Sequence, residues 1–132
     1  GRDEPGAAVD GAQIFSAQCA ACHQATGQGI PGVFPPLAGS EWATGKERLI
    51  VQILLHGIDG PITVKGANYQ GAMPNFGEKL NDAEIAAVTS YVRKQWGNTA
   101  SPISPATVAT ERDATKARSK PWTGGDELAQ FR

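Results

Sequence analysis

The hydrophobic positions of the chain follow a helical repeat in three stretches, separated by segments rich in glycine and proline. Apolar residues three and four positions apart lie on one face of a helix, so each stretch predicts an amphipathic helix. The stretches cover about 10–22, 44–56 and 81–96. Their apolar faces are formed by Ile14, Phe15 and Cys19, by Leu49, Ile50, Ile53 and Leu54, and by Ile85, Val88, Tyr91, Val92 and Trp96.

The ends of these helices are also marked in the sequence. Asp10 and Thr44 are favourable N-cap residue types at the start of the first two stretches. Asn81, with Glu84 three residues later, forms a variant of the capping box. A glycine directly follows the second and the third stretch, as is common after helix ends.

Between the helices the chain is predicted to form long loops. Residues 24–43 and 57–77 contain too many glycines and prolines for regular elements, and 62–64 offers at most a strand fragment. Long loops inside compact domains usually carry function. We therefore expect an all-α fold with three main helices, whose loops surround a functional site.

The length of 132 residues suits one domain. Residues 1–9 mix glycine, proline and charge without a repeat, which indicates a flexible lead-in or a linker. Residues 98–132 are rich in Ser, Thr, Pro, Ala and charge. We expect a folded domain over 10–97 and a C-terminal extension over 98–132, which either wraps the domain or hangs free.

The composition indicates a protein that needs a large cofactor to complete its core. Leu, Ile, Val and Phe together make up only about a fifth of the chain, which is little for a self-sufficient core. The net charge of −1 nevertheless argues against disorder. A large apolar cofactor would supply the missing core.

Charge and hydropathy restrict the partners and the location. The isoelectric point of about 6.1 leaves no basic field for nucleic acid or an anionic bilayer. No apolar run is long enough to span a membrane, and the first ten residues lack the features of a signal peptide. We expect a mature or excised form of a protein without a membrane span.

The strongest chemical signal is the sequence C-A-A-C-H at Cys19, Cys22 and His23, which matches the attachment motif of c-type haem. Two thiols at this spacing can each reach one vinyl group of the same porphyrin, and the next residue brings an imidazole to the iron. A thioredoxin-like pair would need a βαβ context, and a zinc site would need four well-placed ligands. The motif favours one covalent haem c, with His23 as the first axial ligand.

The second axial position has three candidates: Met73, His56 or no protein ligand. Met73 is the only methionine, lies in a glycine-flanked loop and is followed by Pro74. His56 ends an apolar helix, where it would more simply interact with the helix dipole. We expect Met73 to be the ligand.

Ligation by histidine and methionine favours electron transfer, because a thioether raises the reduction potential and leaves no open site on the iron. We therefore expect an electron carrier and not an enzyme. The alternative is a haem enzyme or a gas sensor with a vacant sixth position.

Over Asp10 to Gly97 the chain resembles the class I (His/Met) bacterial cytochromes c. The resemblance rests on the haem motif, on Met-Pro at 73–74, and on Gly11 and Phe15, which match the family's contact between its first and last helices. It implies the class I fold around one haem.

The resemblance also implies residues that orient the haem. A proline carbonyl accepts the Nδ1 proton of the proximal histidine in this family, and Pro35 matches that position best, with Pro36 as the alternative. The haem propionates usually find donors at positions that correspond to four residues of this chain. These are Trp42, Arg48, Asn68 and Tyr69.

The two haem loops and the tail are similar to those of cytochrome subunits or domains of periplasmic dehydrogenases and other redox enzymes. This similarity implies a bacterial periplasmic location and redox protein partners such as a dehydrogenase, a reductase or a terminal oxidase. We expect these partners to meet an apolar ring around the haem edge. The ring could be formed by Ile30, Pro31, Val33, Phe34, Met73, Pro74 and Phe76. The alternative is that Phe34 and Phe76 belong to the core.

Overall fold

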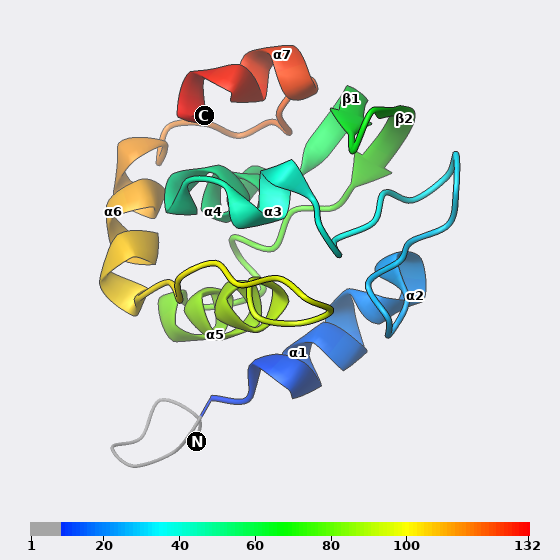
Figure 1. Ribbon diagram of the computed structural model, residues 1–132. Helices are drawn as coiled ribbons and strands as arrows, with labels where there is room; N and C mark the ends of the chain where they lie inside the picture. Colours follow the sequence, from blue (N-terminus) through cyan, green and yellow to red (C-terminus); the bar gives the residue numbers. More distant parts are fainter. Residues whose placement is uncertain (1–8) are drawn as a thin grey trace.

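Helices α1 (Gly11–Gln18) and α5 (Asp82–Val92), far apart in the sequence, pack against each other in the computed structural model, which describes residues 9–132 (Figure 1). A Cβ atom on Gly11 would collide with the backbone carbonyl of Ala87. The missing side chain therefore allows the two helices to touch. The contact matches the pairing of first and last helices that the family resemblance implies.

The first predicted helix is present but interrupted. Asp10 caps α1 by accepting hydrogen bonds from the backbone N–H groups of Ala12 and Gln13, at 3.0 and 3.2 Å. The helix is interrupted at Cys19, and a second short helix, α2 (Ala20–His23), follows it. The haem motif therefore begins at the break between the two helices.

The second predicted helix starts later than expected. Thr44 ends a short helix, α3 (Glu41–Thr44), instead of capping the next one, because Ser40 caps α3 and accepts a bond from the Thr44 hydroxyl through its carbonyl, at 2.8 Å. Helix α4 (Glu47–His56) then ends before Gly57, as predicted. Helix α4 is buried along most of its length.

The third predicted helix is α5, and its capping box between Asn81 and Glu84 is present. The helix ends at Val92, earlier than the expected end at Trp96. Trp96 adopts a positive φ of 54°, which closes the turn after the helix.

An antiparallel hairpin of β1 (Ile58–Val64) and β2 (Ala67–Met73) occupies the second predicted loop. Its turn consists of Lys65 and Gly66, both with positive φ, as tight hairpin turns require. The sequence predicted only a fragment at 62–64, so the all-α prediction omitted this sheet. The described residues are mostly helical, with one small two-stranded sheet.

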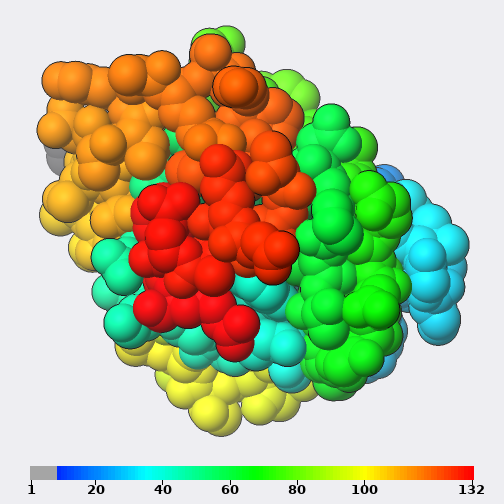
Figure 2. All heavy atoms as spheres, turned by 90° about the horizontal axis from the view of Figure 1, so that it is seen from above, coloured from blue at the N-terminus to red at the C-terminus, as the bar shows by residue number. Residues whose placement is uncertain are grey.

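The C-terminal segment wraps the rest of the chain (Figures 1 and 2). It contains α6 (Pro105–Ala114), α7 (Gly125–Leu128) and the 3₁₀ helix η1 (Ala129–Phe131). Helix α6 packs on α4 and α5, and α7 packs on β1. The predicted lead-in, except for residue 9, lies outside the described residues.

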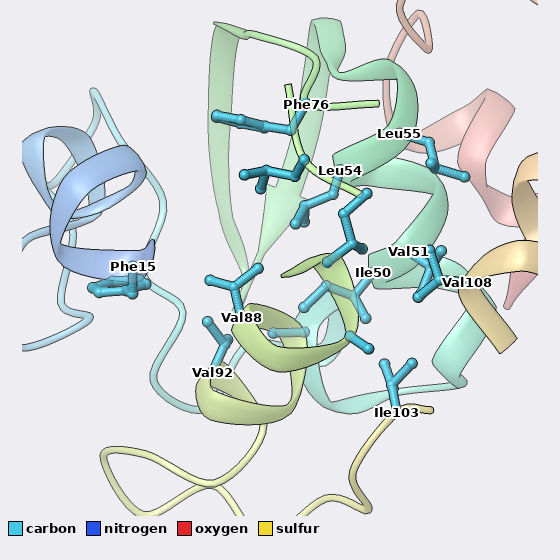
Figure 3. Packing of buried hydrophobic residues seen from close by; sticks show 14 residues of the cluster. Phe15, Ile50, Val51, Leu54, Leu55, Phe76, Val88, Val92, Ile103 and Val108 are labelled. Carbon is cyan, nitrogen blue, oxygen red and sulfur yellow. The ribbon is translucent and has the colours of Figure 1, made fainter. Parts of the chain in front are cut away.

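The buried side chains form two clusters. The first joins α1, α4, α5 and α6, and Figure 3 shows Phe15 reaching it from α1 and Val108 from α6. The second lies between α4, the hairpin and the C-terminal segment, and includes Trp42, Tyr69 and Trp122. Met73 packs against both clusters, so it lies where they meet.

Within residues 9–132, no helix is both long enough and apolar enough to cross a membrane.

Candidate haem site

An apolar cavity lies between α1–α2, the loop after α2, helices α4 and α5, and the inner face of the hairpin. It encloses about 1210 Å³ of empty space, part of which is open to solvent. Cys19, Cys22, His23 and Met73 all line it, although 54 positions separate the first from the last. The fold therefore brings the haem motif and the predicted second ligand to one cavity.

His23 is held in a defined orientation at the end of α2. Its Nδ1 atom lies 2.9 Å from the carbonyl oxygen of Pro35, to which it donates a hydrogen bond when the proton sits on Nδ1. That tautomer leaves the lone pair of Nε2 free to bind a metal. The hydrogen bond goes to Pro35 and not to the alternative, Pro36, which only lines the cavity.

Burial also favours the neutral imidazole. Desolvation lowers the pKa of His23 below its ordinary value, against the smaller opposite effect of the Pro35 hydrogen bond. A neutral imidazole is the form that binds iron.

The two cysteines are half-buried and not bonded to each other. Burial, together with the neighbouring Cys22, raises the pKa of the Cys19 thiol to about 11. Such a thiol is protonated at neutral pH, whereas a thioredoxin-like nucleophile needs a lowered pKa.

In the part of the chain that is described, no cluster of three or more His, Cys, Asp or Glu side chains is arranged to hold a metal ion.

Met73 is the last residue of β2 and is half-buried at the cavity wall. A Cβ atom on Gly57 would collide with the Met73 carbonyl, so the end of α4 and the end of the hairpin are in close contact. Phe76, three residues later, donates its backbone N–H to the Leu54 carbonyl at 2.8 Å. These contacts hold the backbone on both sides of Met73.

The four predicted propionate donors divide into two pairs. Trp42 and Tyr69 are buried and line the cavity, and the Trp42 indole N–H donates to the Thr63 carbonyl at 2.7 Å. Arg48 and Asn68 do not line it. Arg48 donates to the carbonyls of Phe131 and Gln130, and the Asn68 side-chain oxygen accepts from the Thr63 hydroxyl.

Much of the remaining wall comes from residues that the sequence did not single out. Ile58, Ile62 and Val64 project from alternate positions of β1, and Gly71 faces them from β2. A Cβ atom built on Gly71 meets no atom within 4 Å, so the absent side chain leaves room in the cavity. The alternation of apolar and polar residues at Ile58-Asp59 and Ile62-Thr63-Val64 was the available signal in the sequence. An apolar chamber of this kind fits a porphyrin.

His56, the alternative ligand, lies outside this cavity. Its Nε2 atom is 2.8 Å from the Thr115 hydroxyl, and its ring packs edge-on against Trp122 at 5.5 Å between centroids. Burial, followed by the nearby charges of Arg118 and Arg112, lowers the pKa of His56. His56 therefore belongs to the contact between α4 and the C-terminal segment.

We predict that His56 makes the protein less stable in mild acid. Its folded pKa lies below the ordinary value of 6.5, so below that pH the unfolded chain binds more protons and gains stability. The free energy of unfolding should fall as the pH drops from about 7 to 5.5, and His56→Gln should reduce this slope. Denaturant titrations across the pH series measure both. An unchanged slope in the variant would show that His56 titrates normally.

The apolar cavity and the C-A-A-C-H motif on its wall indicate a c-type haem protein, and the sequence comparisons agree. A family model for cytochrome c matches residues 8–96, and the chain belongs to the cytochrome c family. Haem c, bound covalently, is the cofactor of this family and of this chain. The relatives are electron carriers or cytochrome subunits of dehydrogenases, and electron transfer is therefore the activity of this chain.

The relatives include a cytochrome c-552 and cytochrome c subunits of dehydrogenases. The chain is 44% identical over 129 residues to cytochrome c-552 of Thermus thermophilus, an alignment that covers 94% of this chain and 84% of that protein. It is 37% identical over 113 residues to the cytochrome c subunit of a quinone alcohol dehydrogenase of Komagataeibacter europaeus, which covers 85% of this chain and 23% of that subunit. A gluconate 2-dehydrogenase cytochrome c subunit of Pantoea cypripedii is 34% identical over 90 residues.

Proposed function

We propose that this chain carries electrons through one haem c that is bonded to Cys19 and Cys22, with His23 and Met73 as the axial ligands of the iron. The observation that carries the proposal is that all four side chains line one apolar cavity. When bound, the haem supplies a one-electron couple between ferrous and ferric iron. The fold around it corresponds to the class I arrangement, with 10–97 as the cytochrome domain and 98–132 as an extension.

Each protein group has a separate task in this proposal. Pro35 fixes the tautomer and the ring orientation of His23 through the 2.9 Å hydrogen bond. The thioether of Met73 raises the reduction potential relative to a second imidazole. The apolar wall excludes water, which favours the reduced form with its lower net charge. Trp42 and Tyr69 remain candidates for contact with the propionates.

We further propose that the chain works in the bacterial periplasm and exchanges electrons with a dehydrogenase, a reductase or a terminal oxidase. The named dehydrogenase subunits among its relatives support this setting. Attachment of c-type haem in bacteria takes place outside the inner membrane, which also favours it.

Covalent attachment gives the first test. Haem should remain with the denatured polypeptide on a gel and in its intact mass, because two thioether bonds survive unfolding. The double variant Cys19→Ala/Cys22→Ala should lose this stain. Haem that separates from the wild-type protein in acid acetone would contradict the proposed attachment.

A further inference from the structure

We propose that Trp122 is a positioning residue for Met73: it ties the C-terminal segment to the strand that pairs with Met73 and so keeps the methionine sulfur on the iron. The inference rests on the proposed ligation by Met73. We call residues 115–132 the strap. The experiment below separates a failure of this inference from a failure of that ligation.

The backbone of Trp122 pairs with the hairpin opposite Met73. Its N–H donates to the Gly57 carbonyl at 2.9 Å, and its carbonyl accepts from the Asp59 N–H at 2.8 Å. These two bonds flank Ile58 and form a parallel bridge with it. On its other edge Ile58 pairs with Met73. The strap therefore forms a one-residue bridge to β1 at the register position that pairs with the proposed ligand.

The side chain of Trp122 is buried and is held by contacts with three parts of the chain. The indole is only 3% exposed, and its N–H donates to the Gln52 carbonyl in α4 at 2.9 Å. The Arg118 guanidinium lies 3.6 Å from the ring centroid and is paired with Glu127 at 2.8 Å. The Phe131 ring packs edge-on against the indole at 5.1 Å. Trp122 thus joins α4, β1 and the end of the chain.

Two glycines extend the contact beyond the bridge. A Cβ atom on Gly60 would collide with the Thr123 carbonyl, and one on Gly124 would collide with the Pro61 carbonyl. The strap backbone therefore lies directly on β1 with no side chain between them. Figure 2 shows the C-terminal segment, in orange and red, against the hairpin, in green.

This contact matters because a two-stranded hairpin has little stability of its own. Met73 ends the outer strand and is only half-buried, so local opening of the hairpin would carry the thioether away from the iron. The bridge between Trp122 and Ile58 and the buried indole both raise the free energy of such opening. The strap would therefore suppress exchange of the Met73 ligand.

Cyanide binding to the oxidised holoprotein measures how often this ligand leaves. Trp122→Ala should raise the apparent cyanide affinity by at least about tenfold at a pH and temperature where the protein stays folded. The far-red sulfur-to-iron band should also disappear at a lower temperature than the far-ultraviolet helix signal. Trp122→Phe, which keeps most of the ring packing, should restore most of the wild-type behaviour.

Val108→Ala is the matched control. Val108 is fully buried in α6, also in the C-terminal segment, but it belongs to the first cluster and not to the hairpin contact. Its truncation should lower the denaturation midpoint and leave cyanide affinity within about twofold of wild type. An equal rise of cyanide affinity in Val108→Ala would show that Trp122 contributes only to general stability. That result would overturn the inference.

Gly124→Ala provides a variant that perturbs the strap but leaves the Trp122 side chain in place. Gly124 has φ 131°, and the added Cβ would push the strap away from Pro61, so cyanide affinity should again rise. If Trp122→Ala does not fold, the cyanide affinities of Gly124→Ala and Trp122→Phe test the positioning role instead. Wild-type cyanide affinity in the strap variants, beside strong binding in Met73→Ala, refutes the positioning role. Wild-type affinity in Met73→Ala refutes the ligation instead.

Discussion

Replacing Met73 with alanine should leave a folded protein that keeps its haem but has lost the far-red sulfur-to-iron charge-transfer band of the oxidised form. The thioether is proposed as the sixth ligand, and Met73 is the only methionine in the chain. Its removal should also lower the reduction potential by on the order of 0.2 V, within the roughly 0.8 V range that axial ligands span. Absorption spectra and a potentiometric titration measure these effects.

The same variant should bind carbon monoxide and cyanide readily, because the iron gains an open position. His56→Ala is the control, since His56 contacts Thr115 and Trp122 and does not line the haem cavity. It should change neither the band nor ligand binding. If His56→Ala loses the band and binds these ligands while Met73→Ala does neither, then His56 and not Met73 is the sixth ligand.

Placing a charge at Val33 should slow electron exchange with the partner protein by more than about tenfold. Val33 and Ile30 are the exposed large hydrophobic side chains of the described residues, at 52% and 39% exposure, and both lie on the loop after α2. A glutamate at Val33 would have to lose its hydration on docking, and tenfold corresponds to only about 1.4 kcal/mol. The second-order rate with the physiological partner measures the effect of Val33→Glu.

The matched control is Ala106→Glu, which adds the same charge on the exposed side of α6. It should leave the rate nearly unchanged, and added salt should slow the wild-type exchange only slightly. The segment 10–97 holds six Lys and Arg against seven Asp and Glu, so no strong field steers the encounter. A steep fall of the rate with ionic strength would contradict the apolar docking surface.

A basic run in the tail, formed by Arg112, Lys116, Arg118 and Lys120, is the alternative docking surface. Arg112 pairs with Asp82 at 2.8 Å, and Arg118 pairs with Glu127 at the same distance. Lys116 lies 3.4 Å from Asp113. The tail therefore uses much of its positive charge within the protein.

Local signals in the sequence were sufficient for the elements that depend on near neighbours. The capping box of Asn81 and Glu84 predicted the start of α5, and Asp10 caps α1 as expected. These interactions lie within three residues, so a single sequence contains both partners. The C-A-A-C-H motif is equally local, and family membership confirms the haem c that it predicted.

The parts that depended on distant partners were not predictable in the same way. Thr44 looks like an N-cap until Ser40 takes that role for a shorter helix. Arg48, predicted as a propionate donor, donates hydrogen bonds to the carbonyls of Gln130 and Phe131, more than eighty positions away, and no local signal indicates these partners. The hairpin was missed because Gly60 and Pro61 interrupt the alternation of apolar and polar residues in β1, a pattern that indicates a loop when only the sequence is considered.

The most direct measurement of the central claim is the proton NMR spectrum of the reduced protein. A methionine bound to low-spin ferrous haem holds its methyl group over the porphyrin face, where the ring current moves the resonance far upfield of all other signals. We expect one such methyl resonance, and it must come from Met73 because the chain has no other methionine. A reduced, haem-bearing protein whose methionine methyl resonates at its ordinary position would contradict an iron held between His23 and Met73.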